Sequence, residues 1–183
     1  MSDLEPRAEQ WIEPYWNAEH LRRARDWLVV LQPEVDEASR LAALTHDMER
    51  HFRGGRSVSL DDPAGEPVYH DQHSRRSAQI VGAWLRAEGA DDELANRVEE
   101  LVRLHETGGT PEADLVQAAD SLSFLEVNPA LVESWVRDGR CSRERGAEQL
   151  RWMFERIRVE RARELGRPLF EGALARLSRV SAE

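Results

Sequence analysis

The chain has 183 residues, which is long enough to bury a sizeable core and corresponds to one domain over residues 1–183. Its formal net charge of -10 at pH 7 argues against a general nucleic-acid binder, because such binders neutralise phosphates with clustered basic charge. The single cysteine, Cys141, excludes an internal disulfide, and the lack of a membrane-length apolar run or a signal peptide predicts a cytoplasmic protein without membrane contacts.

Apolar residues recur at helical spacing in segments that glycine and proline separate. The first helix begins at Asn17, which suits an N-cap, and Pro33 follows its end. In chain order, the pattern predicts helices over residues 17–31, 34–48, 71–88, 91–105, 111–127, 129–136 and 142–165. Gly166 and Pro168 are expected to close the last of these before a short final helix. No strand pattern of period two appears, so the predicted fold class is all-α.

One long irregular segment interrupts the helices after the second of them. Arg53–His70 reads "RGGRSVSLDDPAGEPVYH" and holds three glycines, two prolines and two aspartates. A loop of this length in a compact domain is more often functional or mobile than idle. We therefore expect it to help shape a binding pocket.

Polar residues stand where the apolar helices end or pack. His46 and Asp47 follow the apolar run of "RLAALTHDMERHF". Asp120 follows two alanines in the stripe "LVQAADSLSF", where an ionised carboxylate is costly unless it is paired or bound to a metal. A lone histidine is usually a core or capping residue, but residues on separate helices can converge on one interior point. The candidate metal ligands are His20, His46, Asp47, His73, His105 and Asp120.

This order of residues resembles the HD-domain superfamily of metal-dependent phosphohydrolases. In that family an isolated histidine, an adjacent His-Asp pair and a later aspartate bind a metal. Members with two metals insert two further histidines between the pair and the last aspartate. The residues of this chain that match the pattern are His20, His46 with Asp47, His73, His105 and Asp120.

The resemblance covers residues 17–127 and leaves residues 128–183 as a helical extension with no counterpart. It implies a single HD-type helical bundle. The passages "HETGG" and "AADSLSFLE" are most similar to small bacterial members that hydrolyse nucleotides, including dinucleoside tetraphosphates. Two features depart from those enzymes, because Arg50 stands where they usually have a lysine and the loop at residues 53–70 is longer.

What the resemblance implies is a metal centre that hydrolyses phosphoester or phosphoanhydride bonds. Asp47 would bridge two ions and act in catalysis. The other ligands divide into His20, His46 and Asp120 for one ion and His73 and His105 for the other. A nitrogen-rich set favours one or two ions of iron, manganese, nickel or zinc over magnesium. The site becomes locally positive and suits a phosphorylated small molecule such as a nucleotide.

Three further residues near the motif have two possible roles each. Arg50 lies three residues after Asp47, so its planar guanidinium is a second catalytic candidate that would contact a substrate phosphate, with a surface ion pair as the alternative. His51 and His70 stand at the ends of the loop as candidate general acids, with an exposed histidine as the alternative. His70 and His73 also have helical spacing for a shared metal, which ranks below the family pattern.

Other functions stay compatible with the sequence. One is a metal-containing nucleotide-binding or regulatory module without significant turnover. Another is a metal-free helical interaction protein, in which the six polar residues would coincide by chance. The helices after residue 128 are also a candidate surface for a homodimer.

Overall fold

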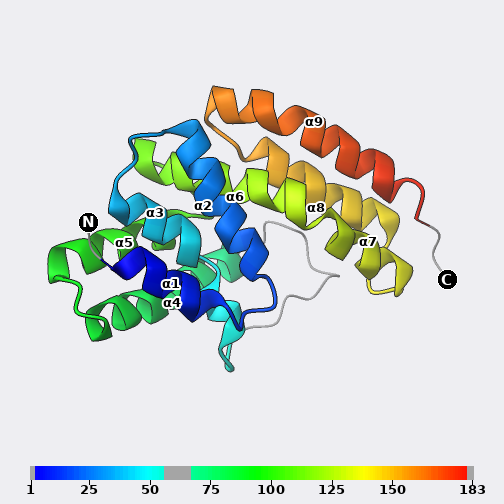
Figure 1. Ribbon diagram of the computed structural model, residues 1–183. Helices are drawn as coiled ribbons and strands as arrows, with labels where there is room; N and C mark the ends of the chain where they lie inside the picture. Colours follow the sequence, from blue (N-terminus) through cyan, green and yellow to red (C-terminus); the bar gives the residue numbers. More distant parts are fainter. Residues whose placement is uncertain (1–2, 56–66, 181–183) are drawn as a thin grey trace.

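Two helices, α2 (Ala18–Leu31) and α6 (Pro111–Val127), pack along each other at the centre of the molecule (Figure 1). This computed structural model describes residues 3–55 and 67–180. Within these ranges the chain forms nine α-helices, one short 3-10 helix and no strand, which confirms the all-α fold class. The other elements are α1 (Leu4–Ile12), α3 (Glu37–Thr45), η1 (Met48–His51), α4 (Pro67–Ala87), α5 (Asp92–Leu104), α7 (Pro129–Arg137), α8 (Arg143–Glu155) and α9 (Glu160–Leu177).

Two apolar clusters lie on either side of the central pair. On one side α1, α3, α4 and α5 bury residues such as Ile12, Leu41 and Leu85. On the other side α7, α8 and α9 pack around Leu122 of α6. Figure 1 shows these two groups of helices at opposite ends of the molecule. Trp27 of α2 contacts both clusters and so joins the two groups of helices into one structure. Each fully buried leucine stabilises the folded state by roughly 1.5 to 3 kcal/mol.

Local signals fix the start of three helices around the centre. The side chains of Asp36, Asp91 and Thr110 cap α3, α5 and α6, because each accepts a hydrogen bond from the backbone N–H three residues later. Pro111 occupies the first turn of α6, where its missing N–H breaks no helical hydrogen bond. The predicted helix over residues 111–127 therefore coincides with α6.

Helix α1 is absent from the predicted elements. Leu4, Ala8 and Ile12 lie four residues apart on one face of this helix, and all three are buried. The segment also holds Pro6, which is a helix breaker in most positions but is tolerated within a first turn. The helical pattern here is short and becomes clear only when its burial against α3 is known.

The predicted helix over residues 142–165 is two helices, α8 and α9. The prediction that Gly166 and Pro168 close a helix was wrong, because both residues lie inside α9. A Cβ atom on Gly166 would lie 2.9 Å from Leu122 Cδ2. This glycine lets α9 approach α6 closely instead of ending a helix.

The segment around the predicted loop also differs from expectation. Residues 67–70 belong to α4, residues 53–55 precede it, and residues 56–66 lie outside the described part of the chain. The predicted helix over residues 34–48 is confined to α3 and is followed by η1. Within the described ranges, no helix has both the length and the hydropathy that crossing a membrane requires.

Candidate metal centre

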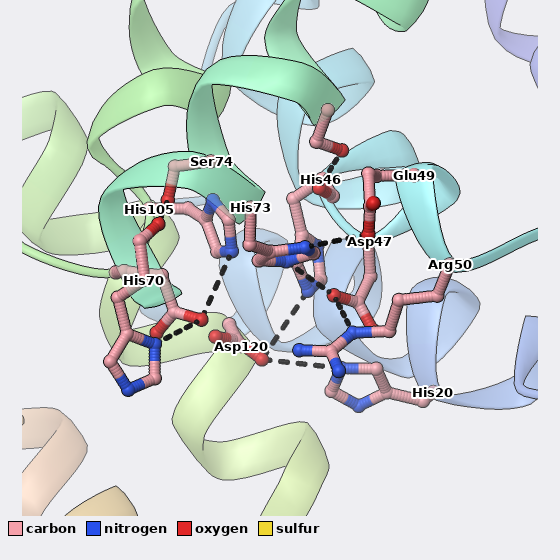
Figure 2. Close-up of polar contacts among 12 residues, drawn as sticks. His20, His46, Asp47, Glu49, Arg50, His70, His73, Ser74, His105 and Asp120 are labelled. Carbon is pink, nitrogen blue, oxygen red and sulfur yellow. Dashed lines mark hydrogen bonds and ion pairs between the residues drawn. The ribbon is translucent and has the colours of Figure 1, made fainter. Parts of the chain in front are cut away.

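Six buried polar side chains meet where α2, α3, α4, α5 and α6 come together (Figure 2). The structure brings together all the ligands proposed from the sequence, which are His20, His46, Asp47, His73, His105 and Asp120. None of these residues is more than 8% exposed. Such a concentration of polar groups inside a core is unfavourable unless the groups satisfy one another or hold a cation.

Two of the histidines directly follow the ends of helices. His46 follows α3 and donates from Nδ1 to the carbonyl oxygen of Ala43 at 2.9 Å. His105 follows α5 and donates from Nδ1 to the carbonyl oxygen of Val102 at 2.6 Å. The last carbonyls of a helix lack intrahelical partners, so each histidine caps its helix. Because a carbonyl only accepts, Nδ1 carries a proton, and in the neutral form of each ring the lone pair lies on Nε2.

In the other two histidines, His20 and His73, a side chain accepts the hydrogen bond from Nδ1. The Ser123 hydroxyl donates to the carbonyl oxygen of His20 at 2.6 Å, so its oxygen accepts from His20 Nδ1 at 2.9 Å. The carboxylate of Glu49 accepts from His73 Nδ1 at 3.0 Å, and Arg76 holds Glu49 at 2.6 Å. All four imidazoles therefore offer Nε2 to the interior, and such outer partners also orient the histidines of known metal sites.

Two aspartates face these nitrogen atoms. Asp120 Oδ1 lies 3.2 Å from His20 Nε2 and 3.3 Å from His46 Nε2. Asp47 Oδ1 lies 2.9 Å from His73 Nε2, and the Tyr15 hydroxyl donates to Asp47 Oδ2 at 3.0 Å.

His73 Nε2 has no hydrogen-bond partner among the described residues, although the Asp47 carboxylate is so near. A buried lone pair that faces a carboxylate is unfavourable, and either a proton or a metal cation between the two removes the conflict. Burial alone would lower the pKa of His73, but the carboxylates of Asp47 and Glu49 accordingly outweigh burial and raise this pKa. The mixed nitrogen and oxygen donors suit a transition metal. The residues present therefore fit a bound metal ion.

The ligand atoms form three adjoining groups. These are His20–His46–Asp120, His46–Asp47–His105 and His73–His105–Glu106, and the ligand atoms of each group lie within 4.8 Å of one another. Neighbouring groups share His46 and His105, whose ring centres are 5.0 Å apart. The site thus offers a row of cation positions, which suits more than one ion.

Glu106 is the candidate ligand that the sequence interpretation missed. Its Oε1 atom lies 3.6 Å from His105 Nε2 and 3.1 Å from His70 Nδ1, and the residue is only 9% exposed. Its position directly after His105 in "HETGG" was the available signal. A glutamate next to a helix end is usually a solvated residue, so the sequence alone did not single it out.

Charges in the site set the protonation states. Burial alone would raise the pKa of Asp47 and of Asp120, but the neighbouring guanidinium, Arg50 or Arg156, and the facing histidines together hold both pKa values well below the ordinary range. Burial lowers the pKa of His105 to about 4. At pH 7 both aspartates are ionised and His105 is neutral, which are the states that metal ligands require.

Arg50 lies inside this cluster. Its Nε atom donates to Asp47 Oδ1 at 2.7 Å, and its guanidinium also donates to the Tyr69 hydroxyl at 2.9 Å. Its ion-pair partner is thus a buried aspartate and not a surface glutamate. The contact of Arg50 with a substrate phosphate stays a prediction.

The two histidines that flank the predicted loop have different environments. His51 lies exposed in η1. His70 lies in α4 with a side chain only 13% exposed, and its ring stacks on Trp152 with ring centres 4.6 Å apart. The alternative of an exposed loop histidine was therefore wrong for His70. None of the three ligand groups within residues 3–55 and 67–180 includes His70.

These features define an all-helical protein with a buried histidine–carboxylate centre that could hold metal ions. A family profile matches residues 2–139, and its description is a domain of unknown function, DUF4202. The chain belongs to this DUF4202 family. The family description names neither a metal nor an activity.

One curated relative and the solved structures complete the comparison. The mouse von Willebrand factor A domain-containing protein 5A is 39% identical over 77 residues, which are 40% of this chain and 10% of that protein. The chain therefore spans about a tenth of the length of this relative. No solved structure matches the chain.

Proposed function

We propose that this protein is a metal-dependent phosphohydrolase that cleaves a phosphoester or phosphoanhydride bond, with a nucleotide as substrate. The observation that carries the proposal is the common orientation of four buried imidazoles, each with Nδ1 occupied by an acceptor and Nε2 directed at a carboxylate. The carboxylates are those of Asp120, Asp47 and Glu106. The order of these residues along the chain resembles the HD superfamily, which supports the same activity. The net charge and the absence of a basic stripe make nucleic acid an unexpected partner.

The chemistry of the ligands narrows the metal. Four imidazoles with carboxylates favour iron, manganese, nickel or zinc over magnesium, which prefers oxygen ligands. Bound at this site, one or two such ions would lower the pKa of a coordinated water and attract phosphate oxygens.

The chain's own residues would orient these groups. Asp47 is held on both carboxylate oxygens, by the Tyr15 hydroxyl on Oδ2 and by Arg50 on Oδ1. This fixed carboxylate would orient the ligand sphere. Arg50, with a side chain 29% exposed, would offer its remaining N–H groups to a phosphate of the substrate.

The test combines metal content with turnover. Elemental analysis of protein purified without chelator should give one or two transition-metal ions per chain, and His46→Ala and Asp47→Asn should lose them while keeping their helical circular dichroism. His51→Ala is the matched control, because His51 is an exposed histidine of the adjoining η1 helix, and it should keep the metal.

Release of phosphate from mononucleotides, and conversion of dinucleoside tetraphosphates and water into two nucleotides followed by chromatography, should then require the metal and disappear in both site variants. Metal binding with nucleotide-induced thermal stabilisation but no hydrolysis of any of these nucleotides would favour a binding or regulatory module instead. If no metal binds after attempted reloading, the protein is a metal-free helical protein and the proposal is wrong.

A further inference from the structure

Arg156 reaches the centre from a part of the chain that the DUF4202 match does not cover. It follows the last residue of α8, and its side chain is only 7% exposed. Its guanidinium donates to Glu106 Oε2, to Asp120 Oδ2 and, at 2.8 Å, to the Ser121 hydroxyl. The guanidinium also lies 4.5 Å from the ring centre of Trp152. One fixed cation thus connects Asp120 of the first ligand group with Glu106 of the third.

The formal charges around the centre disfavour binding of a second dication without an accompanying anion. The buried or half-buried carboxylates are Asp47, Glu49, Glu106 and Asp120, and the guanidiniums paired with them are Arg50, Arg76 and Arg156. With neutral imidazoles these groups have one net negative charge. A first dication makes the centre singly positive, and a second makes it triply positive. Uncompensated charge in a protein interior is strongly unfavourable, so the second ion needs an anion.

Glu106 is where the second ion and Arg156 come into conflict. The carboxylate is shared between Arg156 on Oε2 and the His73–His105–Glu106 group on Oε1, whose distance to His105 Nε2 is 3.6 Å. An ion in that group would lie on the opposite side of the same carboxylate from the guanidinium. Two cations on one small carboxylate repel each other unless a further anion joins them.

From this geometry we propose that Arg156 binds a phosphoryl group and thereby couples phosphate binding to the uptake of the second metal ion at His73, His105 and Glu106. Three of the five N–H groups of the guanidinium donate to Ser121, Glu106 and Asp120, which leaves one N–H group on Nη1 and one on Nη2. These two donors would bind phosphate oxygens, and phosphate supplies the missing negative charge. By linkage, phosphate tightens binding of the second ion by the factor by which that ion tightens binding of phosphate. The inference rests on the proposed metal centre and deepens it, because it names the group of the ligand that the centre recognises.

The experiment measures Mn²⁺ binding to the full chain by equilibrium dialysis, with four additions: none, inorganic phosphate, adenosine 5′-monophosphate and adenosine. We expect one ion to bind without phosphate and a second ion to bind at least about tenfold more tightly with phosphate or the monophosphate. Adenosine should have no effect. An effect of the monophosphate alone would show that the phosphoryl group must belong to an organic ligand, which still supports the proposal.

Two variants separate the role of Arg156 from a general effect of ionic composition. Arg156→Met should reduce the effect of phosphate on the second ion to less than about twofold. Arg158→Met is the matched control, since Arg158 is two residues away, 52% exposed and paired with Asp114, and it should behave as the unaltered protein does. Arg156→Lys keeps the charge without the planar donors and should retain only part of the coupling.

The outcomes distinguish the two proposals. If two ions bind with the same affinity with and without phosphate in the unaltered chain, the inference about Arg156 is overturned and the metal centre stands. The same holds if Arg156→Met keeps the full phosphate effect. If the unaltered chain binds no Mn²⁺, iron, nickel or zinc under any of the four conditions, the proposed metal centre fails and this inference fails with it.

Discussion

Single hydrogen bonds decide which nitrogen atom of each histidine faces the interior of this protein. The acceptors for Nδ1 are two backbone carbonyls, one serine hydroxyl and one carboxylate, and each leaves Nε2 as the free ligand atom. Their variety shows that no single motif encodes this second layer of contacts. The sequence pattern that identifies the candidate ligands does not identify the residues that orient them.

The Ser123 contact can be tested by removing one oxygen atom. Ser123→Ala deprives His20 Nδ1 of its acceptor, so the ring is free to rotate and its Nε2 is held less firmly toward Asp120. We expect metal affinity to fall by roughly 10 to 100-fold, measured by competition with a chelating indicator. Ser134→Ala is the control, because it removes a similar hydroxyl that donates to the carbonyl of Leu131 in α7, away from the site. Equal affinities in both variants would contradict the orienting role.

The low pKa of His105 makes the metal-free protein sensitive to acid. Burial lowers this pKa from 6.5 to about 4 while Glu106, His46, His73 and Asp120 surround the ring. The unfolded chain then binds the proton more tightly than the folded chain. The His105 contribution to stability is therefore complete above pH 6.5 and is lost as the pH falls toward 4.

The measurement is urea denaturation of chelator-treated protein between pH 7.5 and 4, compared with His105→Gln. We expect the difference in unfolding free energy between the two proteins to change by on the order of 2 kcal/mol across this range. The comparison cancels titrations that both proteins share. A difference that stays constant with pH would show that the folded protein protonates His105 as easily as the unfolded chain does.

At the scale of elements, helix boundaries set by local signals could be predicted from the sequence, and boundaries that depend on long-range packing could not. The sequence predicted α6 from residue to residue because Thr110 and Pro111 mark its start through contacts within one turn. It did not predict the break between α8 and α9, where Arg156 contacts Glu106, a residue that is distant along the chain. It treated Gly166 as a helix end because the contact with Leu122 cannot be seen locally.

Two glycines of α9 provide a matched test of that packing. Valine at position 166 would meet Leu122, which is fully buried, and should lower the free energy of unfolding by about 1 to 3 kcal/mol. Gly172→Val makes the same change in the same helix where nothing lies within 4 Å, so it should be neutral or slightly stabilising. Thermal and urea denaturation of both variants measure the contrast. Equal effects would mean that α9 does not pack closely on α6 through residue 166.

The difference between local signals and long-range packing also explains which site residues the sequence predicted. The order of six residues along the chain resembles the HD pattern, and this resemblance predicted that His20, His46 and their partners form one cluster. Glu106 and Arg156 were not found. Each is a charged residue near a helix end, where most such residues are solvated, and only the packing of α6 with α8 makes them interior groups.

For the whole molecule, metal binding is expected to contribute to stability because the ligands come from five segments that are separate in the unfolded chain. A metal at about 100 times its dissociation constant adds roughly 2.7 kcal/mol. Removing it should lower the melting temperature by about 5 to 10 °C for a chain of this size. Differential scanning calorimetry with and without chelator measures this.

The control for that experiment is a pair of aspartate variants. Asp120→Asn should melt at one temperature whether or not chelator is present, since it lacks a central ligand. Asp92→Asn changes an aspartate with an 85% exposed side chain and should respond to chelator as the unaltered chain does. If Asp120→Asn keeps the full response, the metal binds elsewhere.

The break after α8 has a consequence for how this protein can be divided. The DUF4202 match ends at residue 139, yet the guanidinium that Asp120 and Glu106 share belongs to residue 156. A fragment cut at the edge of the matched region would leave two interior carboxylates without their common counter-charge, a loss of about 3 to 5 kcal/mol for a broken buried pair. The smallest unit that can fold around this centre is therefore larger than the unit that sequence similarity outlines.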